Sequence, residues 1–99
     1  MIQEKVKLAK KQAEGYVVPL GPVNLVFVIT DAGMVGCGAF DVLALDKFSY
    51  PAARVKPTTG PSISTIDDLL AGEIKDANSA AAKRGVVAGM SGREALDLM

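Results

Sequence analysis

Two glycine-containing segments of the sequence hold the side chains best suited to chemistry. The first runs from Cys37 to Asp41 and carries a thiol and a carboxylate, with Gly38 next to the thiol. A thiolate just ahead of a helix is stabilised by the helix dipole and by free N–H groups. Gly38 leaves room for a substrate to approach. This segment predicts a nucleophile at Cys37 with Asp41 as its partner, whereas a cysteine that only fills a gap in the core explains the same pattern structurally.

The second segment is Gly89-Met90-Ser91-Gly92-Arg93, placed just ahead of an expected helix. Glycines there leave backbone N–H groups free to face a phosphate or carboxylate. Arg93 falls in the first turn, where a positive charge opposes the dipole, so we expect a carboxylate or an anionic ligand to compensate it. The structural alternative is helix capping by Ser91 and Glu94. The residues predicted to bind the ligand are Gly38, Arg54, Ser91, Gly92 and Arg93, with Asp41 paired to Arg54 or Arg93.

The composition excludes several classes of catalytic and metal site. The chain has no histidine, which excludes Ser-His-Asp and Cys-His catalysis and zinc held by histidine. A single cysteine allows neither an internal disulfide nor a CxxC metal knuckle. The aspartates show no recognisable ligand spacing, the P-loop spacing is absent, and the glycines around Cys37 do not follow the element order of a Rossmann unit. We therefore predict neither a metal nor a cofactor.

Charge and hydropathy bear on partners and location. Eleven basic residues balance eleven acidic ones, and nucleic-acid binders usually carry a basic excess, so no nucleic-acid partner is predicted. The longest strongly apolar stretch, Leu25–Ile29, is too short to span a bilayer. The start of the chain does not resemble a signal peptide, and a lone thiol is typical of a reducing compartment, so we expect a cytoplasmic protein without a membrane partner. The apolar surplus, 49% of residues, favours a homo-oligomer.

The first half of the sequence predicts four strands. Alternation of apolar and polar residues indicates a strand over 2–8, and a second is expected over 15–20, following a turn over 10–15. Pro19 places this second strand at an edge or ends it. Residues 24–30 form a nearly continuous apolar run typical of a central strand. They pair in a hairpin with 34–37 through a turn at Thr30-Asp31-Ala32-Gly33, where we expect a positive φ at Gly33.

The second half predicts mainly helices. A helix is expected over 40–48, ended by Pro51, and a strand over 52–56 precedes a loop over 57–64. Thr65 is the expected N-cap of a helix over 66–71 closed by Gly72. A helix over 73–83, a short strand over 86–88 and a capped C-terminal helix from Ser91 complete the chain. Strands first and helices later predict one α+β domain over 1–99, with helices packed on a mainly antiparallel sheet.

Three segments together resemble one protein family. They are Cys37-Gly38-Ala39-Phe40-Asp41-Val42, Thr65-Ile66-Asp67-Asp68-Leu69-Leu70 and Gly89-Met90-Ser91-Gly92-Arg93-Glu94-Ala95-Leu96. In this order and spacing they are similar to the YunC-like proteins, small bacterial and archaeal proteins of unknown function, and the likeness covers roughly 24–99. The resemblance implies an α+β fold and brings no activity with it.

The residues themselves lead us to predict a homo-oligomeric binding or regulatory module. It would hold a small anionic molecule between the segment from Cys37 to Asp41 and the segment from Gly89 to Arg93. Two alternatives remain open: a histidine-free enzyme that uses Cys37 as its nucleophile, and a purely structural oligomer subunit.

Overall fold

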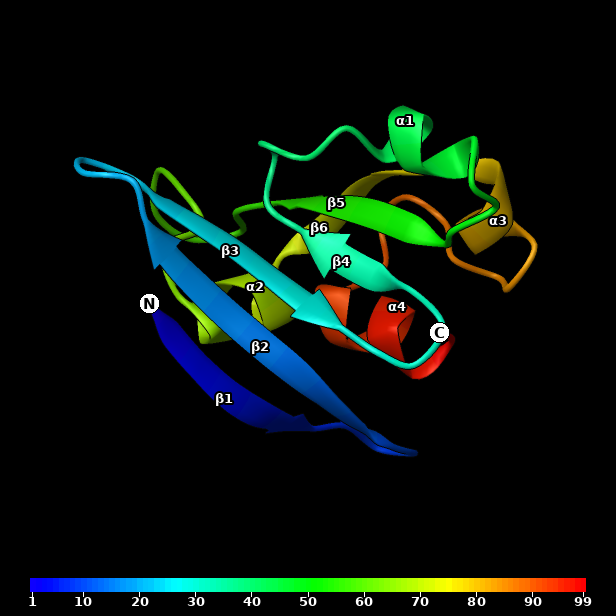
Figure 1. Cartoon of the computed structure of the whole chain (residues 1–99), viewed down its shortest axis with the longest axis horizontal. Coiled ribbons are helices and arrows are strands. Elements are labelled where there is room, and N and C mark those ends of the chain that lie inside the picture. The colour runs from blue at the N-terminus through cyan, green and yellow to red at the C-terminus, as the bar shows by residue number, and fades with distance from the viewer.

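A six-stranded sheet forms the centre of the fold in the computed structural model, which describes residues 1–99 (Figure 1). The strands lie in the sheet in the order in which they occur in the chain: β1 (Ile2–Lys7), β2 (Gln12–Pro19), β3 (Asn24–Ile29), β4 (Met34–Gly36), β5 (Ala52–Lys56) and β6 (Glu73–Ala77). Neighbouring strands are antiparallel except β4 and β5, which are parallel. The predicted α+β class with a mainly antiparallel sheet is confirmed.

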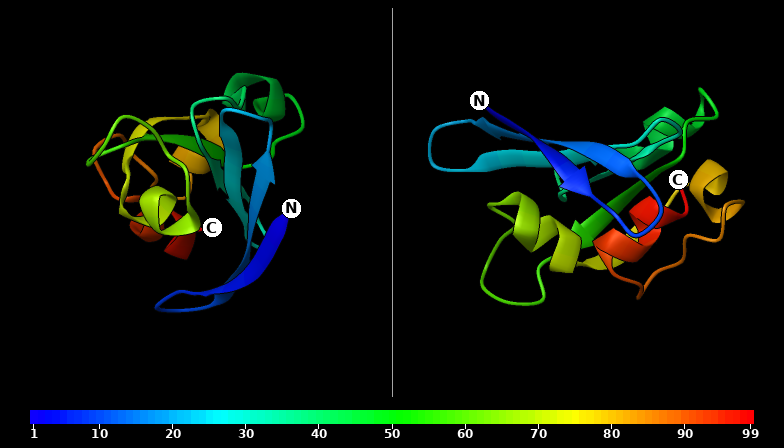
Figure 2. Two further views of the ribbon diagram at one scale, coloured as in Figure 1. Left: turned by 90° about the vertical axis from the view of Figure 1, so that its left-hand side faces the viewer. Right: turned by 90° about the horizontal axis from the view of Figure 1, so that it is seen from below.

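Four short helices complete the structure: α1 (Val42–Asp46), α2 (Ile66–Ala71), α3 (Ser79–Ala82) and α4 (Gly92–Asp97). Figure 2 shows α2, α3 and α4 on one face of the sheet and α1 on the other. Each helix begins at a polar N-cap whose side chain accepts a backbone N–H. None of these helices has the length or the apolar composition needed to cross a membrane.

The main core lies between the sheet and the three helices on its first face. Alternate strand residues such as Val26 and Val28 point into it and meet Leu69 of α2 and Leu96 of α4. A much smaller cluster of Met34, Val42 and Ala52 lies beneath α1 on the second face. Helix α1 is thus the only helix on the second face, whereas three helices cover the first.

The parallel pair β4–β5 has connections that leave toward opposite faces. After β4 the chain crosses the second face through α1 and returns to β5, with Val35 opposite Ala53. After β5 the chain passes through the loop 57–64 to α2 on the first face. In Figure 1 the turn between β2 and β3 and the loop 57–64 lie at the same end of the molecule, where β4 and β5 end. A divergence of this kind opens a crevice at the carboxyl ends of parallel strands.

Several sequence predictions are confirmed almost to the residue. The strands β1, β3, β4 and β5, the hairpin from β3 to β4, and the capped helices α2 and α4 lie within two residues of their predicted bounds at most ends. β2 is not at an edge but does end at Pro19. Gly33 does not have a positive φ; glycine is required because a Cβ there would meet the carbonyl of Pro51 and the sulfur of Met99.

The predicted helix over 73–83 is wrong, since this segment forms β6 followed by α3. Pairing with β5, which sets Val55 opposite Ile74, outweighs the helical tendency of the alanines that follow. The turn predicted over 10–15 is also wrong, because Ala13 and Gly15 belong to β2 and face the core beside Val17. No strand forms at 86–88.

Candidate functional site

Cys37 directly follows β4 and is buried, with 7% of its surface exposed. Its amide donates to the carbonyl oxygen of Val26 at 3.0 Å, which keeps it in the sheet. Helix α1 begins only at Val42, two residues later than predicted, and Asp41 is its N-cap. Cys37 therefore lies outside the first turn of α1, and the expected stabilisation of its thiolate by that helix is not supported by the geometry.

Asp41 and Arg54 do not pair with each other. Asp41 Oδ1 accepts the Ala44 amide at 3.0 Å, the capping role. Arg54 Nε donates to Asp76 Oδ1 at 2.8 Å, and its Nη2 donates to the second oxygen of Asp76. Its Nη1 donates to the Gly38 carbonyl oxygen at 3.3 Å. The hydrogen bond to Asp76 raises the pKa of Arg54, and the same bond lowers the pKa of Asp76.

A first cavity, of about 520 Å³, lies beside α1 and contains three of the predicted site residues, Gly38, Asp41 and Arg54. Asp76 also lines it, so two carboxylates face one guanidinium. The guanidinium already bonds to Asp76 and Gly38 through Nε, Nη1 and Nη2. An anion in this cavity would meet net negative charge, which is unfavourable in a partly desolvated site.

A second cavity, of about 460 Å³, occupies the crevice at the carboxyl ends of β4 and β5. We call it the end crevice. Its lining residues come from the turn between β2 and β3, the end of β4, the end of β5, the loop 57–64 and β6: Leu20, Pro22–Leu25, Cys37–Ala39, Val55–Pro57, Ser62–Ser64 and Lys75. The Asn24 side chain donates to the Ser64 carbonyl oxygen at 3.0 Å, joining the loop 57–64 to β3.

The end crevice combines an apolar floor with a basic rim. Val55 and Ile63 are buried core residues that line it together with Cys37, while Leu20 and Val23 remain more than half exposed. Lys56 and Lys75 are the charged residues of the lining, which includes no carboxylate. Lys56 Nζ lies 3.5 Å from Glu73, and Lys75 has no ion-pair partner within 4.0 Å. Such a lining fits a molecule with an apolar body and an anionic end.

The two lysines were missed by the sequence reasoning. Lys56 and Lys75 are far apart in the chain and lie in no motif. They come together only because β5 and β6 are antiparallel neighbours, with Lys56 opposite Glu73 and Val55 opposite Ile74. The sequence could have placed the two lysines together only if 73–77 had been predicted as a strand paired with β5, and the alanines that follow favoured a helix there.

The segment from Gly89 to Arg93 lies elsewhere. The Ile74 amide donates to the Met90 carbonyl oxygen at 2.7 Å, so this segment runs along the outer edge of β6. Both β5 and β6 separate it from the end of β4, a distance of roughly 14 Å at the usual strand spacing. None of Ser91, Gly92 and Arg93 lines any of the three cavities.

Local structure accounts for Ser91, Gly92 and Arg93. Ser91 and Glu94 form the capping box, and the hydrogen bond from the Ser91 amide lowers the pKa of Glu94. Gly92 packs against the Leu69 carbonyl, and Arg93 Nη1 donates to the Lys7 carbonyl oxygen at 3.1 Å. The structure does not bring these residues to Cys37.

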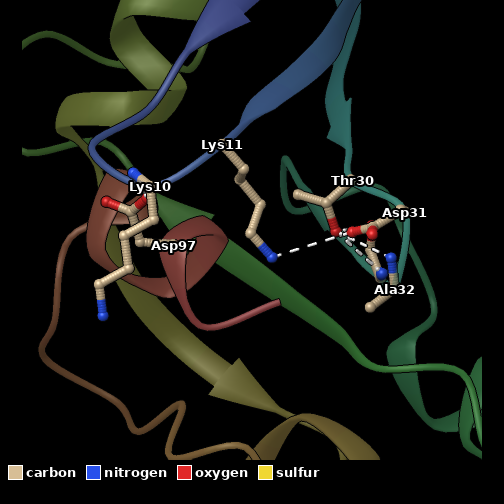
Figure 3. Close-up of polar contacts among 7 residues, drawn as sticks. Lys10, Lys11, Thr30, Asp31, Ala32 and Asp97 are labelled. Atoms are coloured by element: carbon tan, nitrogen blue, oxygen red, sulfur yellow. Dashed lines mark hydrogen bonds and ion pairs between the residues drawn. The ribbon is translucent and has the colours of Figure 1, made fainter.

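Polar contacts join the turn between β1 and β2 to α4 and to the turn between β3 and β4 (Figure 3). The Lys10 amide donates to Asp97 of α4 at 3.1 Å, and Lys11 Nζ lies 3.8 Å from Asp31.

A third cavity, of about 440 Å³, lies near Ala32 and is mostly polar. In this cavity the Ser79 hydroxyl donates a hydrogen bond to Asp46, and this bond lowers the pKa of Asp46. It lacks the apolar floor of the end crevice.

Comparison with known proteins assigns the chain to a family. The family model described as "Domain of unknown function (DUF1805)" matches residues 36–99. The chain belongs to the DUF1805 family. The uncharacterised protein YunC of Bacillus subtilis is 35% identical over 79 residues, which span 80% of this chain and 77% of YunC. The likeness to YunC expected from the sequence is therefore confirmed.

A solved structure agrees with the fold of this DUF1805 chain. The crystal structure of TA1206 from Thermoplasma acidophilum, a protein of unknown function, aligns with a TM-score of 0.85 over 97% of this chain and 89% of its own, at 24% identity. This likeness shows the fold alone. The matched DUF1805 segment includes most of the end crevice, while the turn between β2 and β3 precedes it.

Proposed function

We propose that this protein is a binding module that holds a small molecule with an apolar body and an anionic end in the end crevice. The observation that carries the proposal is the pairing of an apolar floor with Lys56 and Lys75, without a carboxylate, where the only parallel strands end. Crevices at such strand ends are the usual ligand sites of sheets whose connections diverge.

Each part of the crevice contributes differently to binding. Burial of the ligand's apolar body on the floor supplies about 25 cal/mol per Å² of apolar surface removed from water. Lys75 supplies charge without an existing partner, whereas Lys56 must share its charge with Glu73. We therefore expect Lys75 to orient the anionic end and to contribute more of the selectivity than Lys56.

The proposal keeps part of the site predicted from the sequence and replaces the rest. Cys37 and Gly38 line the crevice, and Arg54 donates a hydrogen bond to the carbonyl oxygen of Gly38. The basic side chains come from β5 and β6 in place of Arg93. The free thiol fits a reducing compartment such as the cytoplasm, which remains part of the proposal.

A thermal-shift titration tests the proposal, with hexanoate and phenyl phosphate as probes and hexanol and phenol as uncharged counterparts. We expect the anions to raise the melting temperature of the wild type more than the alcohols do. Lys75→Ala should remove most of this difference and Lys56→Ala part of it. Lys47→Ala, an exposed lysine beside α1, is the matched control and should respond like the wild type. Equal responses of Lys75→Ala and the wild type would refute the proposal.

The alternative of an enzyme with Cys37 as nucleophile has one observation in its favour, the position of Cys37 on the crevice floor. The thiol has no hydrogen-bond partner within 4.0 Å, and the lining holds no carboxylate to accept its proton. Alkylation by iodoacetamide distinguishes the two functions. A binding module should react slowly at neutral pH, and an occupying anion should slow the reaction further; fast alkylation at neutral pH would favour the enzyme.

A further inference from the structure

The pairing of β5 with β6 is interrupted by a β-bulge next to the end crevice. Arg54 lies opposite Asp76 and Val55 lies opposite Ile74, so Lys75 has no partner in β5 and is the extra residue of the bulge. Bulges beside binding sites change the direction in which a side chain points. Lys75 is also the residue of β6 that lines the end crevice.

The bulge brings two carboxylates of β6 to the same face of the sheet. Directly opposite residues of an antiparallel pair share a face, so Glu73 shares the face of Lys56, and Asp76 shares that of Arg54. Lys56 and Arg54 are two residues apart in β5 and therefore lie on one face. In a strand without a bulge, positions 73 and 76 would face opposite sides. The extra residue thus gives each carboxylate a cation of β5 to pair with.

The ion pairs across β5 and β6 leave one positive charge uncompensated. Lys56 Nζ lies 3.5 Å from Glu73, and the Arg54 guanidinium binds Asp76 through two of its nitrogens. Lys75 has no ion-pair partner within 4.0 Å. This group of side chains therefore has an excess of one positive charge, which Lys75 carries.

Neighbouring carboxylates do not add to the positive charge that a ligand meets. Asp68 accepts the Ser64 amide at 3.0 Å, and Asp41 caps α1. Neither carboxylate lines the crevice, and the lining offers no cation besides its two lysines. A second negative charge on the ligand could therefore be balanced only if Lys56 left its carboxylate partner.

We infer that Glu73 is a positioning residue that limits the end crevice to ligands with a single negative charge. Glu73 holds Lys56 and so leaves Lys75 to meet the anionic end of the ligand. A doubly charged end would draw Lys56 away and would then be repelled by the freed carboxylate of Glu73; such repulsion is one way in which a site rejects the wrong ligand. The ligand class is therefore an apolar monoanion, such as a carboxylate, in preference to a dianionic phosphate monoester. This inference rests on the proposed function, because it concerns the ligand of the same crevice.

Isothermal titration calorimetry at pH 8 with hexyl sulfate and hexyl phosphate tests the inference. The two probes have the same apolar body, but hexyl phosphate carries close to two charges at this pH because the second pKa of a phosphate monoester is about 6. The wild type should bind hexyl sulfate at least as tightly as hexyl phosphate. Glu73→Gln should shift the ratio of the two dissociation constants toward hexyl phosphate by about two- to fivefold, the range of an exposed ion pair.

Two further variants separate the selection of charge from a structural role of Glu73. Glu73→Asp keeps the carboxylate and should keep the wild-type ratio of the two dissociation constants. Glu4→Gln removes one negative charge from an exposed position on β1, at the opposite edge of the sheet from β6, and should also leave the ratio unchanged.

The outcomes distinguish a failure of this inference from a failure of the proposed function. If Lys75→Ala weakens the binding of hexyl sulfate but Glu73→Gln leaves the ratio unchanged, the crevice is a binding site and the inferred role of Glu73 is wrong. A wild type that binds hexyl phosphate more tightly than hexyl sulfate also overturns the inference alone. If neither probe binds, or if Lys75→Ala binds both as the wild type does, the proposed function fails and the inference fails with it.

Discussion

Asn78 shows how a single residue positions the elements around the site. It is 1% exposed, and its amide group makes four hydrogen bonds. Its oxygen accepts from the amides of Ala52 and Ala81, and its nitrogen donates to the carbonyl oxygens of Val42 and Tyr50. One side chain thereby connects β5, α3, α1 and the segment that leads into β5.

We predict that Asn78→Ala destabilises the protein more than any surface substitution. Four backbone groups lose their partner, and each unsatisfied buried group costs about 1–3 kcal/mol, so a loss of at least about 3 kcal/mol is expected. Urea unfolding followed by circular dichroism measures it. Asn24→Ala removes one exposed hydrogen bond and should cost less than about 1 kcal/mol. A similar cost for the two variants would contradict this role of Asn78.

Acid should destabilise the protein through four carboxylates. Hydrogen bonds lower the pKa of Asp46, Asp68, Asp76 and Glu94 in the folded chain. A lowered folded pKa contributes stability above the unfolded value, 3.8 for Asp and 4.5 for Glu, and this contribution is lost as the pH falls through the folded pKa. Unfolding free energy should therefore be steady near pH 6 and decline below about pH 4.5. Asp76→Asn should flatten this decline, and an unchanged slope would contradict the assignment to Asp76.

The local sequence pattern predicted the N-caps of α2 and α4 correctly, but it predicted the candidate binding site only in part. Thr65 and Ser91 each cap a helix through contacts three residues away, which a local pattern can specify. Asp41 was expected to pair with Arg54 or Arg93, but Arg54 pairs with Asp76, which lies opposite it on β6. A partner across a sheet is set by strand register, and no local spacing encodes that register.

At the scale of elements, the packing of α4 on α2 depends on one glycine. A Cβ on Gly92 would overlap the Leu69 carbonyl, a backbone atom that cannot turn away. We predict that Gly92→Ala costs about 1–3 kcal/mol of unfolding free energy, the range for overpacked sites. Gly38→Ala is the matched control, since nothing lies within 4 Å of its added Cβ, and should change stability by less than about 0.5 kcal/mol. Equal stability of the two variants would refute the close approach of α4.

The elements predicted from the sequence differ from those observed mainly where pairing between strands outweighs the helix propensity of the residues. The run at 24–29 is nearly continuous in β-branched and apolar residues, which is typical of a strand, and it forms β3; the strand predicted over 52–56 forms β5. Glu73–Ala77 is a strand because β5 would otherwise present an open edge, and Asn78 then starts α3. That β5 needs a partner strand can be inferred only after the other strands have been placed in the sheet.

At the scale of the whole molecule, the end crevice and the Asn78 contacts are separate. The end crevice lies where the parallel strands end, whereas Asn78 joins α1 and α3 to the start of β5. A ligand-binding defect and a loss of stability should therefore be obtained independently, by Lys75→Ala and by Asn78→Ala. A loss of unfolding free energy in Lys75→Ala as large as that in Asn78→Ala would contradict this separation.

Amide NMR of the wild type titrated with hexanoate tests the central claim most directly. If the end crevice is the binding site, the largest shift changes should map to 20–25, 37–39, 55–57, 62–64 and Lys75, and Lys75→Ala should reduce them. Changes centred on 41–43 and Asp76, or on 89–93, would contradict the assignment of the site to this crevice, as would a spectrum that does not change.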